Sequence, residues 1–254
     1  MIPFKRLLQN ILISLLAIFG TACAPISDVD EPVERVWDKT GEPSDRLIVF
    51  IPGLFDTAIK FKQEEFFSVA REAGIKDDLL AASIHVEHLI QDKLFTRMDN
   101  DIVIPAKKAG YKNIWLVGLS LGGLNSFLYY QAHTDEICGV VLLAPYLSET
   151  LSTQDIIKAS GFKVWQADQA KFKQPVEQKI QDLWAWIQKE NLANVFLGYG
   201  NKDIYLPTHQ RLAKFLDKKN VTELEGKHDW KAGRAIWQQQ VLTREQSGML
   251  KPCK

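Results

Sequence analysis

The sequence has little cysteine, no excess of charge of either sign, and no long hydrophobic run beyond its N-terminal segment. Three cysteines in 254 residues are too few for a disulfide scaffold, and they lack the spacing of a zinc finger. Thirty-one basic residues balance thirty-one acidic ones, so no strong positive field is available to hold a nucleic-acid backbone. These absences argue against a disulfide-rich module, a zinc finger and a nucleic-acid reader.

Apolar and aromatic residues are abundant instead. Hydrophobic side chains make up 46% of the chain, with seven tryptophans, thirteen phenylalanines and six tyrosines. A chain of this length and composition can bury one full core, which excludes disorder for most of it. No internal repeat is present.

The first 22 residues have the features of a signal peptide. Lys5 and Arg6 give a positive start, the apolar run 11–19 follows, and small residues close the segment. The apolar run is too short to span a bilayer comfortably. We therefore expect the chain to be exported.

Cys23 comes directly after these small residues. The segment Gly20-Thr21-Ala22-Cys23 resembles the lipobox of bacterial lipoproteins. The resemblance implies cleavage before Cys23, a lipid on the new N-terminus and a membrane anchor. In a Gram-negative cell, Ala24 after the lipidated cysteine implies the outer membrane, facing the periplasm. Plain secretion after cleavage at a small residue, or an uncleaved anchor, are the alternatives.

Residues 23–45 are expected to form an extended linker. Prolines lie here among acidic side chains, a composition that packs poorly. Val33, Val36 and Trp37 could still dock one short piece onto the body. The folded domain is then expected over residues 46–254.

Two cysteines, Cys138 and Cys253, remain besides the lipidation candidate. In an oxidising compartment they could form a disulfide that fastens the C-terminal tail to the core. The sequence leaves this open, because the distance between the two residues in space is unknown.

From Arg46 onward, short apolar runs alternate with longer segments of helical periodicity. This pattern is typical of parallel strands that helices bury on both faces. The strand candidates are residues 47–51, 82–86, 113–119, 139–144, 195–199 and 221–224. The helix candidates are residues 63–72, 105–108, 121–133, 207–216 and 231–242. The sequence therefore predicts an α/β fold with a mostly parallel central sheet flanked by helices.

Residues 150–194 interrupt this alternation and contain no convincing strand. Apolar residues at helical spacing between Val176 and Ile187 indicate a small helical cap insertion. Trp165 and Trp186 in this segment are candidates for an apolar substrate pocket. In the alternative interpretation, such rings pack the cap onto the body.

The sharpest motif is Gly118-Leu119-Ser120-Leu121-Gly122, between a strand candidate and a helix candidate. A tight strand-to-helix turn presents a serine hydroxyl in a fixed place, and the helix start directs free amides at an oxyanion. The bare Gly-x-Ser-x-Gly string is common by chance and can be a simple tight turn. In this context it indicates that Ser120 is a nucleophile.

The motif and the order of elements around it resemble the α/β-hydrolase fold of serine hydrolases. The resemblance implies an acid after the serine and a histidine last. Asp203, in Gly200-Asn201-Lys202-Asp203, matches the acid, and His228, in Gly226-Lys227-His228, matches the base. An imidazole can take the serine proton while a carboxylate orients its other nitrogen. Weaker competitors are His209, Glu223, Glu225 and Asp229.

An oxyanion hole needs two donors, and main-chain amides can supply both. The resemblance places one at Leu121 and the other in the turn Pro52-Gly53-Leu54-Phe55, where either Leu54 or Phe55 supplies it. Phe55 is also a candidate for the substrate pocket. The opening antiparallel strands of the family have little room before Arg46, so residues 34–38 supply one or the sheet is shorter.

A metal site is the remaining possibility. His85, Glu87 and His88 have ligating side chains, but strand alternation would divide them between two faces. We therefore expect no metal and no cofactor.

The residues together predict a serine hydrolase that cleaves a carboxylic ester through an acyl-enzyme on Ser120. An acyl or lipid ester is the first expectation, with the membrane reached through the N-terminal lipid. A thioesterase or amidase of the same fold is one alternative. A non-catalytic hydrolase-fold binding protein at the cell envelope is another, because fold alone does not determine function.

Overall fold

A single seven-stranded sheet organises the chain in the computed structural model, which describes residues 29–147 and 176–253. The strand order is β1-β3-β2-β4-β5-β6-β7. The strands are β1 (Arg35–Asp38), β2 (Arg46–Ile51), β3 (Asp78–Ala82), β4 (Asn113–Leu119), β5 (Gly139–Leu143), β6 (Val195–Gly200) and β7 (Val221–Leu224). Within the described residues every neighbouring pair is parallel except β1 with β3. The mostly parallel α/β fold predicted from the sequence is confirmed.

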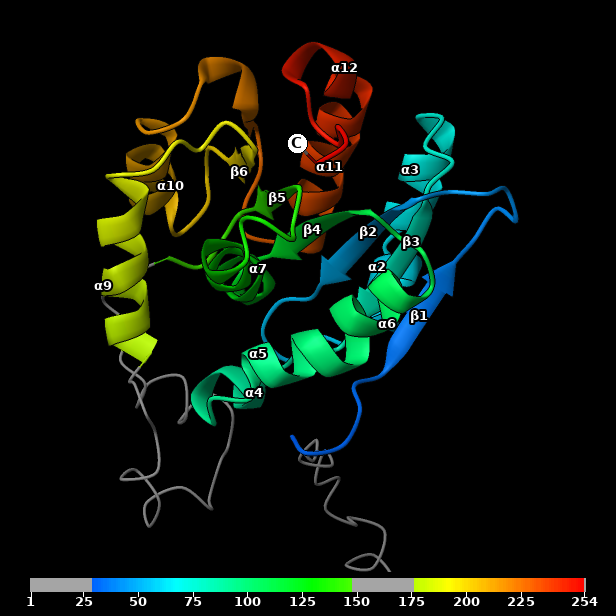
Figure 1. The fold of residues 1–254 in the computed structure, drawn as a ribbon. Helices are drawn as coiled ribbons and strands as arrows, with labels where there is room; N and C mark the ends of the chain where they lie inside the picture. The colour runs from blue at the N-terminus through cyan, green and yellow to red at the C-terminus, as the bar shows by residue number, and fades with distance from the viewer. Residues whose placement is uncertain (1–28, 148–175, 254) are drawn as a thin grey trace, which may run out of the picture.

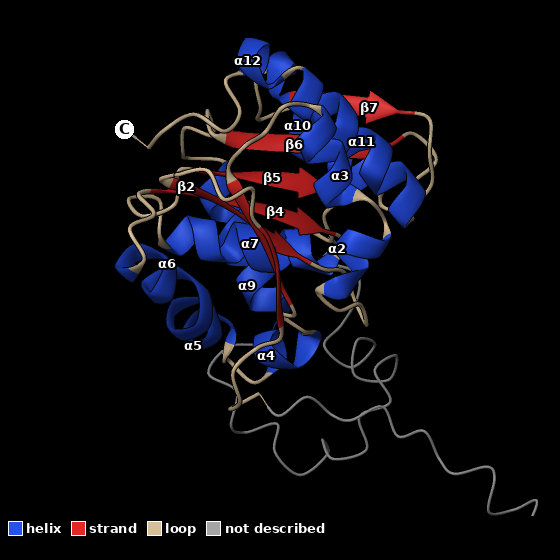
Figure 2. Cartoon of the chain, turned by 90° about the vertical axis from the view of Figure 1, so that its right-hand side faces the viewer, coloured by secondary structure: helices blue, strands red, loops and turns tan. Residues whose placement is uncertain are grey.

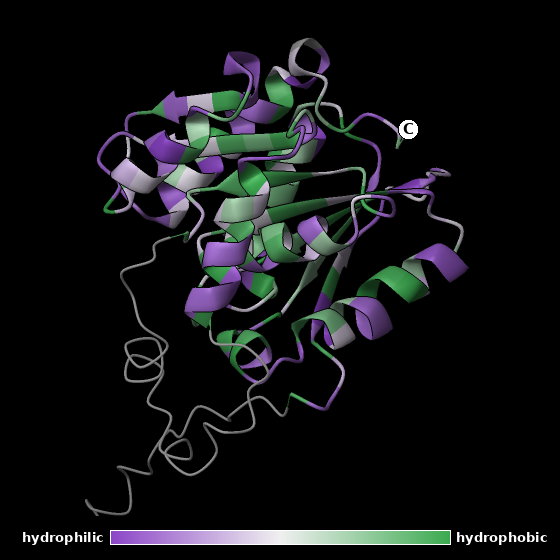
Figure 3. Cartoon of the chain, turned by 60° about the vertical axis from the view of Figure 1, so that its left-hand side comes forward, coloured by the Kyte–Doolittle hydropathy of each residue, from purple (hydrophilic) through white to green (hydrophobic). Residues whose placement is uncertain are grey.

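Helices cover both faces of the sheet (Figures 1 and 2). On one face lie α2 (Ile59–Gln63), α3 (Phe66–Glu72) and α11 (Trp230–Leu242). On the other lie α4 (Val86–Ile90), α5 (Leu94–Met98), α6 (Ile104–Lys108), α7 (Leu121–Ala132), α9 (Val176–Ile187) and α10 (Leu206–Ala213). A π-helical segment, Asp99–Val103, joins α5 to α6, and α12 (Arg244–Ser247) follows α11. Two apolar layers result, with hydrophobic strands between them (Figure 3).

The central strands read as nearly continuous apolar runs because both of their faces are covered. Every residue of β4, β5 and β6 is buried. Burial on both faces removes the alternation of polar and apolar residues that a half-exposed strand would show. These strands could therefore be located from the sequence to within one residue.

Residues 29–45 belong to the fold, in contrast to the extended linker expected for residues 23–45. β1 pairs antiparallel with β3, with Arg35 opposite Ala82. The main-chain N–H of Val33 donates to the buried carboxylate of Asp101 at 3.0 Å. The folded part therefore begins upstream of residue 46, and β1 is the opening strand for which the sequence offered residues 34–38.

β3 lies earlier than the strand expected at 82–86, because the chain turns into α4 at that point. His85 is the N-cap of α4, and its N–H donates to Nδ1 of His88 at 2.9 Å. The two rings stack at the helix start instead of alternating across a strand. Among the described residues, no group of three or more His, Cys, Asp or Glu side chains is arranged to hold a metal ion.

The helix expected over Val176 to Ile187 is present as α9. Its apolar residues are buried, and the indole N–H of Trp184 donates to the main-chain oxygen of Leu147 at 3.2 Å. These contacts pack α9 onto the body. The remainder of the expected cap, including Trp165, lies outside the described residues. No helix in the described part of the chain is both long and apolar enough to cross a bilayer.

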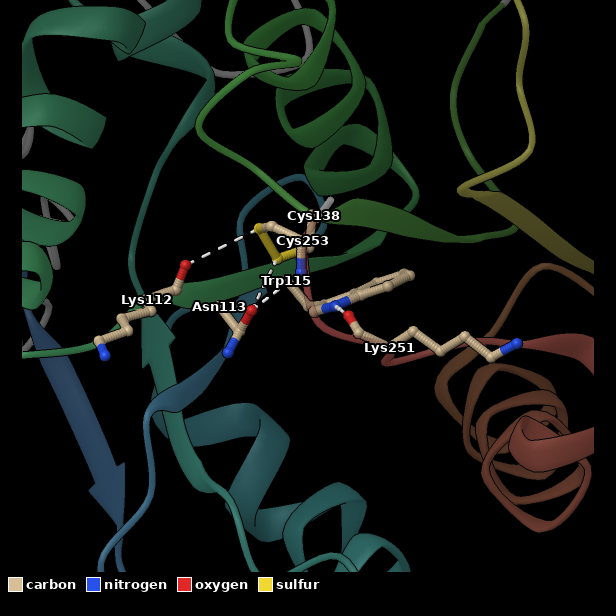
Figure 4. The surroundings of a disulfide bond; sticks show 6 residues. All are labelled: Lys112, Asn113, Trp115, Cys138, Lys251 and Cys253. Carbon is tan, nitrogen blue, oxygen red and sulfur yellow. Dashed lines mark hydrogen bonds between the residues drawn. A yellow bond between two sulfur atoms is a disulfide. The ribbon is translucent and has the colours of Figure 1, made fainter.

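Cys138 and Cys253 form a disulfide across 115 residues of sequence (Figure 4). The neighbouring tail is held as well, since the N–H of Cys253 donates to Oδ1 of Asn113 at 2.9 Å. The indole of Trp115 donates to the main-chain oxygen of Lys251 at 2.9 Å. The pairing that the sequence left open thus fastens the C-terminal tail to the amino ends of β4 and β5.

Candidate active site

Ser120 lies in the tight turn between β4 and α7. Its φ of 53° is in the left-handed region, which a residue with a Cβ occupies only under strain. The surrounding backbone holds this conformation. The N–H of Ser120 donates to the oxygen of Leu143 at 3.0 Å, and its own oxygen accepts from the N–H of Tyr146 at 2.8 Å.

Two glycines allow this turn to pack closely. A Cβ on Gly118 would lie 2.2 Å from the main-chain oxygen of Gly122. A Cβ on Gly122 would lie 2.0 Å from the main-chain oxygen of Ile51 at the end of β2. Only glycine fits at either position, and the Gly-x-Ser-x-Gly pattern is therefore a steric requirement of this turn.

Three residues that are distant in sequence form one hydrogen-bonded chain. Nε2 of His228 lies 2.8 Å from Oγ of Ser120, and Nδ1 of His228 lies 2.8 Å from Oδ2 of Asp203. The second oxygen of Asp203 accepts the N–H of Tyr205 at 2.8 Å. The residues predicted as nucleophile, base and acid are brought together with the connectivity that an activated serine needs.

The carboxylate of Asp203 is fully buried in the loop after β6. Burial alone would raise its pKa. The hydrogen bonds from His228 and from the Tyr205 amide, with the charges of His228 and His209, hold the pKa of Asp203 below its usual value instead. The ionised carboxylate fixes the proton on Nδ1 of His228, so the lone pair of Nε2 faces the serine hydroxyl.

The turn after β2 lies beside the serine. A Cβ on Gly53 would lie 3.5 Å from the Cβ of Ser120, and the N–H of Asp56 donates to the oxygen of Gly53 at 3.3 Å. Within the described residues, the main-chain N–H groups of Leu54, Phe55 and Leu121 donate to no acceptor. Leu121 begins α7, where the helix dipole adds positive potential. Free amides therefore flank Ser120 on two sides, and both Leu54 and Phe55 remain candidates for the second donor.

The pocket candidates divide into three cases. Phe55 is 60% exposed, next to the turn that contacts Ser120. Trp186 packs edge-on against Phe127 and Tyr130 of α7, with ring centroids 5.8 and 6.3 Å apart. Phe127 is two helical turns beyond the serine, so Trp186 contacts α7 away from the nucleophile, and its assignment to the pocket stays a prediction. Trp165 is not among the described residues.

Other side chains that hold the site could not be assigned from the sequence. The ring of Tyr205 stands edge-on to His228, with centroids 5.0 Å apart. His209, expected only as a weak competitor, is fully buried behind the site, with Nε2 3.0 Å from the oxygen of Pro145. The indole of Trp230 donates to Asp56 at 3.1 Å. The one sequence signal that pointed to any of these side chains at the site was the position of Trp230, two residues after His228.

Known proteins share this architecture. A ferulic acid esterase is 14% identical, with a TM-score of 0.57 over 85% of this chain and 99% of that chain. Est1E from Butyrivibrio proteoclasticus is 15% identical, with a TM-score of 0.58 over 84% and 93%. A monoacylglycerol lipase from Paleococcus ferrophilus is 20% identical, with a TM-score of 0.55 over 83% and 99%. Identities this low establish the fold alone.

Sequence comparison gives the family. No curated protein is similar enough in sequence to match the chain. The model of the alpha/beta hydrolase fold family matches residues 97–230, which is more than half of the chain and includes Ser120, Asp203 and His228. The chain belongs to the alpha/beta hydrolase fold family.

Proposed function

We propose that this protein is a serine hydrolase that cleaves a carboxylic ester. The observation that carries the proposal is the chain of two 2.8 Å contacts from Asp203 through His228 to Ser120. A serine hydroxyl becomes a useful nucleophile when a base can accept its proton and a third group orients that base. The strained turn at Ser120 and the free amides beside it supply the remaining requirements.

In the proposed reaction, Oγ of Ser120 attacks the ester carbonyl while Nε2 of His228 takes the hydroxyl proton. The carbonyl oxygen becomes an oxyanion that accepts hydrogen bonds from the Leu121 amide and from Leu54 or Phe55. Collapse breaks the bond to the alcohol, which leaves with the proton from His228. Water then attacks the acyl-enzyme with the same base, which releases the acid and restores Ser120.

The expected substrate is an acyl or lipid ester. One neighbour of the same fold is named as a ferulic acid esterase and one as a monoacylglycerol lipase, which supports ester hydrolysis as a class. A thioester or amide would follow the same route through Ser120, so a thioesterase or amidase remains the second candidate. Each is separated from an esterase by comparing rates on matched acyl substrates.

The decisive experiment is labelling with a fluorophosphonate, read by intact mass, on wild type, Ser120→Ala and His228→Ala. One adduct on wild type, mapped to Ser120 and absent from both variants, is the expected result. Circular dichroism of all three proteins controls for folding. A folded wild type that takes up no label would overturn the proposal and favour the non-catalytic binding protein.

We also propose that the protein is exported and tethered to a membrane by a lipid on Cys23. The lipobox-like segment Gly20-Thr21-Ala22-Cys23 supports the anchor. The disulfide between Cys138 and Cys253 supports an oxidising compartment. The mass of the mature protein tests this directly, because lipidation adds a diacylglycerol that Cys23→Ser would lose.

A further inference from the structure

We propose that the edge of the sheet carrying Ser120 faces the bilayer, and that this edge takes its ester from the lipid surface. This surface, the catalytic edge, consists of the turn after β2, the loop after β6 and the start of α2. The proposal rests on the proposed anchor at Cys23 and names the source of substrate for the proposed activity.

The direction of β1 determines where the N-terminal segment leaves the domain. β1 is antiparallel to β3, so its first residue, Arg35, lies opposite Ala82 at the carboxyl end of β3. β3 is parallel to β2, whose carboxyl end leads into Gly53 beside Ser120. The described residues before β1 therefore approach it from the same edge at which the active site lies.

The segment is held at that edge by several contacts. The oxygen of Asp30 accepts a hydrogen bond from Arg97 at 2.9 Å, and the carboxylate of Asp30 pairs with Lys93 at 2.5 Å. Val29 and Val33 are buried, and the N–H of Val33 donates to Asp101. The first described residue, Val29, is therefore a fixed point on the domain.

Chain length then limits the orientation. Cys23 lies six residues before Val29, and six extended residues span at most about 20 Å. A compact domain of about 200 residues has a diameter of about 40 Å. Because Val29 cannot move farther than the tether from the membrane surface, the domain cannot turn its opposite edge towards the lipid.

The catalytic edge also carries exposed apolar side chains. Phe55, in the turn beside Ser120, is 60% exposed, and Ile204, next to Asp203, is 73% exposed. Ile59, at the start of α2, is 36% exposed. Large apolar side chains left in water beside an active site are typical of a surface that meets lipid. This observation is independent of the tether and points to the same edge.

The chain offers a matched control for these residues. Leu242 is 61% exposed at the end of α11. α11 starts just after His228 at the catalytic edge and runs along the sheet towards the opposite edge. Its thirteen residues span about 18 Å, so Leu242 lies about that far from the catalytic edge. It is an exposed apolar side chain, as Phe55 and Ile204 are, but it lies at the opposite edge.

The experiment measures depth in the membrane and needs no turnover. The mature, lipidated full chain carrying Ser120→Ala is reconstituted in phosphatidylethanolamine and phosphatidylglycerol vesicles that contain nitroxide lipid. Single substitutions Phe55→Cys, Ile204→Cys and Leu242→Cys each carry an environment-sensitive fluorophore, with the native disulfide kept oxidised. We expect severalfold stronger quenching at positions 55 and 204 than at 242. Equal quenching at the three positions would overturn the proposal.

Two further outcomes are informative. Blue-shifted but unquenched emission at 55 and 204 would show that protein and not lipid covers these positions, which also overturns lipid as the occupant. An insertion of about twenty Gly and Ser residues after Ser27 relaxes the length limit and should reduce the quenching. In the active protein, the same insertion should slow hydrolysis of a vesicle-borne ester and leave hydrolysis of a soluble ester unchanged.

The separate proposals fail in separate ways. A mature protein whose mass lacks the diacylglycerol would overturn the proposed anchor, whatever its activity. A wild type that resists fluorophosphonate removes the hydrolase, while the depth measurement on Ser120→Ala still reports the orientation.

Discussion

The indole of Trp230 donates a hydrogen bond to the carboxylate of Asp56 at 3.1 Å, across 174 residues of sequence. Asp56 closes the turn that contains the proposed oxyanion donors, and Trp230 begins the helix that follows His228. Phe61 and Phe66 hold the indole edge-on, with centroids 5.1 and 5.6 Å away. Burial raises the pKa of Asp56, although Trp230 and Lys60 oppose the rise. The bond therefore fixes the oxyanion turn relative to the base.

Trp230→Phe keeps the ring and removes only the donor. We expect kcat for a soluble ester to fall about tenfold with little change in KM. Misplaced amides weaken the hydrogen bonds to the oxyanion of the transition state and leave substrate binding almost unchanged. Asp56→Asn should retain most of the activity, since its amide oxygen still accepts. The matched control is Trp115→Phe, which breaks the indole bond to Lys251 at the opposite edge. A similar loss of kcat in that control would show that the effect is one of general stability.

Gly122→Ala should disrupt the nucleophile turn. The new Cβ would stand 2.0 Å from the oxygen of Ile51, which is backbone and cannot move aside alone. We expect a loss of about 3 kcal/mol or more in the free energy of unfolding. Gly53→Ala is the comparison, because its Cβ would meet no atom closer than 3.4 Å. Urea unfolding of both variants checks the difference, and equal stabilities would contradict the steric account.

His88 should make the domain less stable in mild acid. Burial, with the charges of His85 and Arg97, lowers its pKa from 6.5 to about 4, and its Nδ1 accepts the His85 amide. The unfolded chain takes up this proton below about pH 6.5, whereas the folded chain resists it until about pH 4. Stability is therefore fully present above pH 6.5 and falls on acidification, by about 3 kcal/mol in all.

His88→Gln tests this linkage. Glutamine can still reach the N-cap amide of α4, but it does not titrate. Urea unfolding free energies between pH 4 and 6.5 should then vary less with pH than in wild type, where His85 and His209 also have pKa values lowered by burial. An unchanged pH dependence would rule His88 out as the source.

Replacing both Cys138 and Cys253 by serine should destabilise the fold without changing the site. The disulfide closes a loop of about 115 residues, and such cross-links contribute about 2–4 kcal/mol, mainly by restricting the unfolded chain. Denaturant unfolding measures the loss, and wild type under reducing conditions should match the double variant. Labelling of Ser120 by fluorophosphonate in native buffer should continue at the wild-type rate.

The sequence predicted the serine turn and the order of the site residues because those signals are local. Gly118 and Gly122 are needed by the turn itself. Asp203 follows β6, a buried strand recognisable from its apolar run, and His228 follows the short strand β7. The sheet around them could be predicted for the same reason. Residues held mainly by local backbone geometry leave a local pattern.

Other features depend on contacts between distant segments. β1 is a short edge strand with no residue fully buried, and its position depends on pairing with β3 and on Asp101. His85 belongs to a helix cap that an apolar run made to look like the end of a strand. Trp230 meets Asp56 only in the folded chain. The packing of Trp186 against Phe127 and Tyr130 also depends on contacts between α9 and α7 that the sequence does not show.

The disulfide to Cys253 also determines where the chain can be extended. Its partner, Cys138, immediately precedes β5, so the last residues are fixed where the parallel strands begin, on the side away from Ser120. A tag or surface linkage added at the C-terminus would therefore leave the catalytic edge free. If the protein were immobilised through its C-terminus, the catalytic edge would face the solution and any substrate in it.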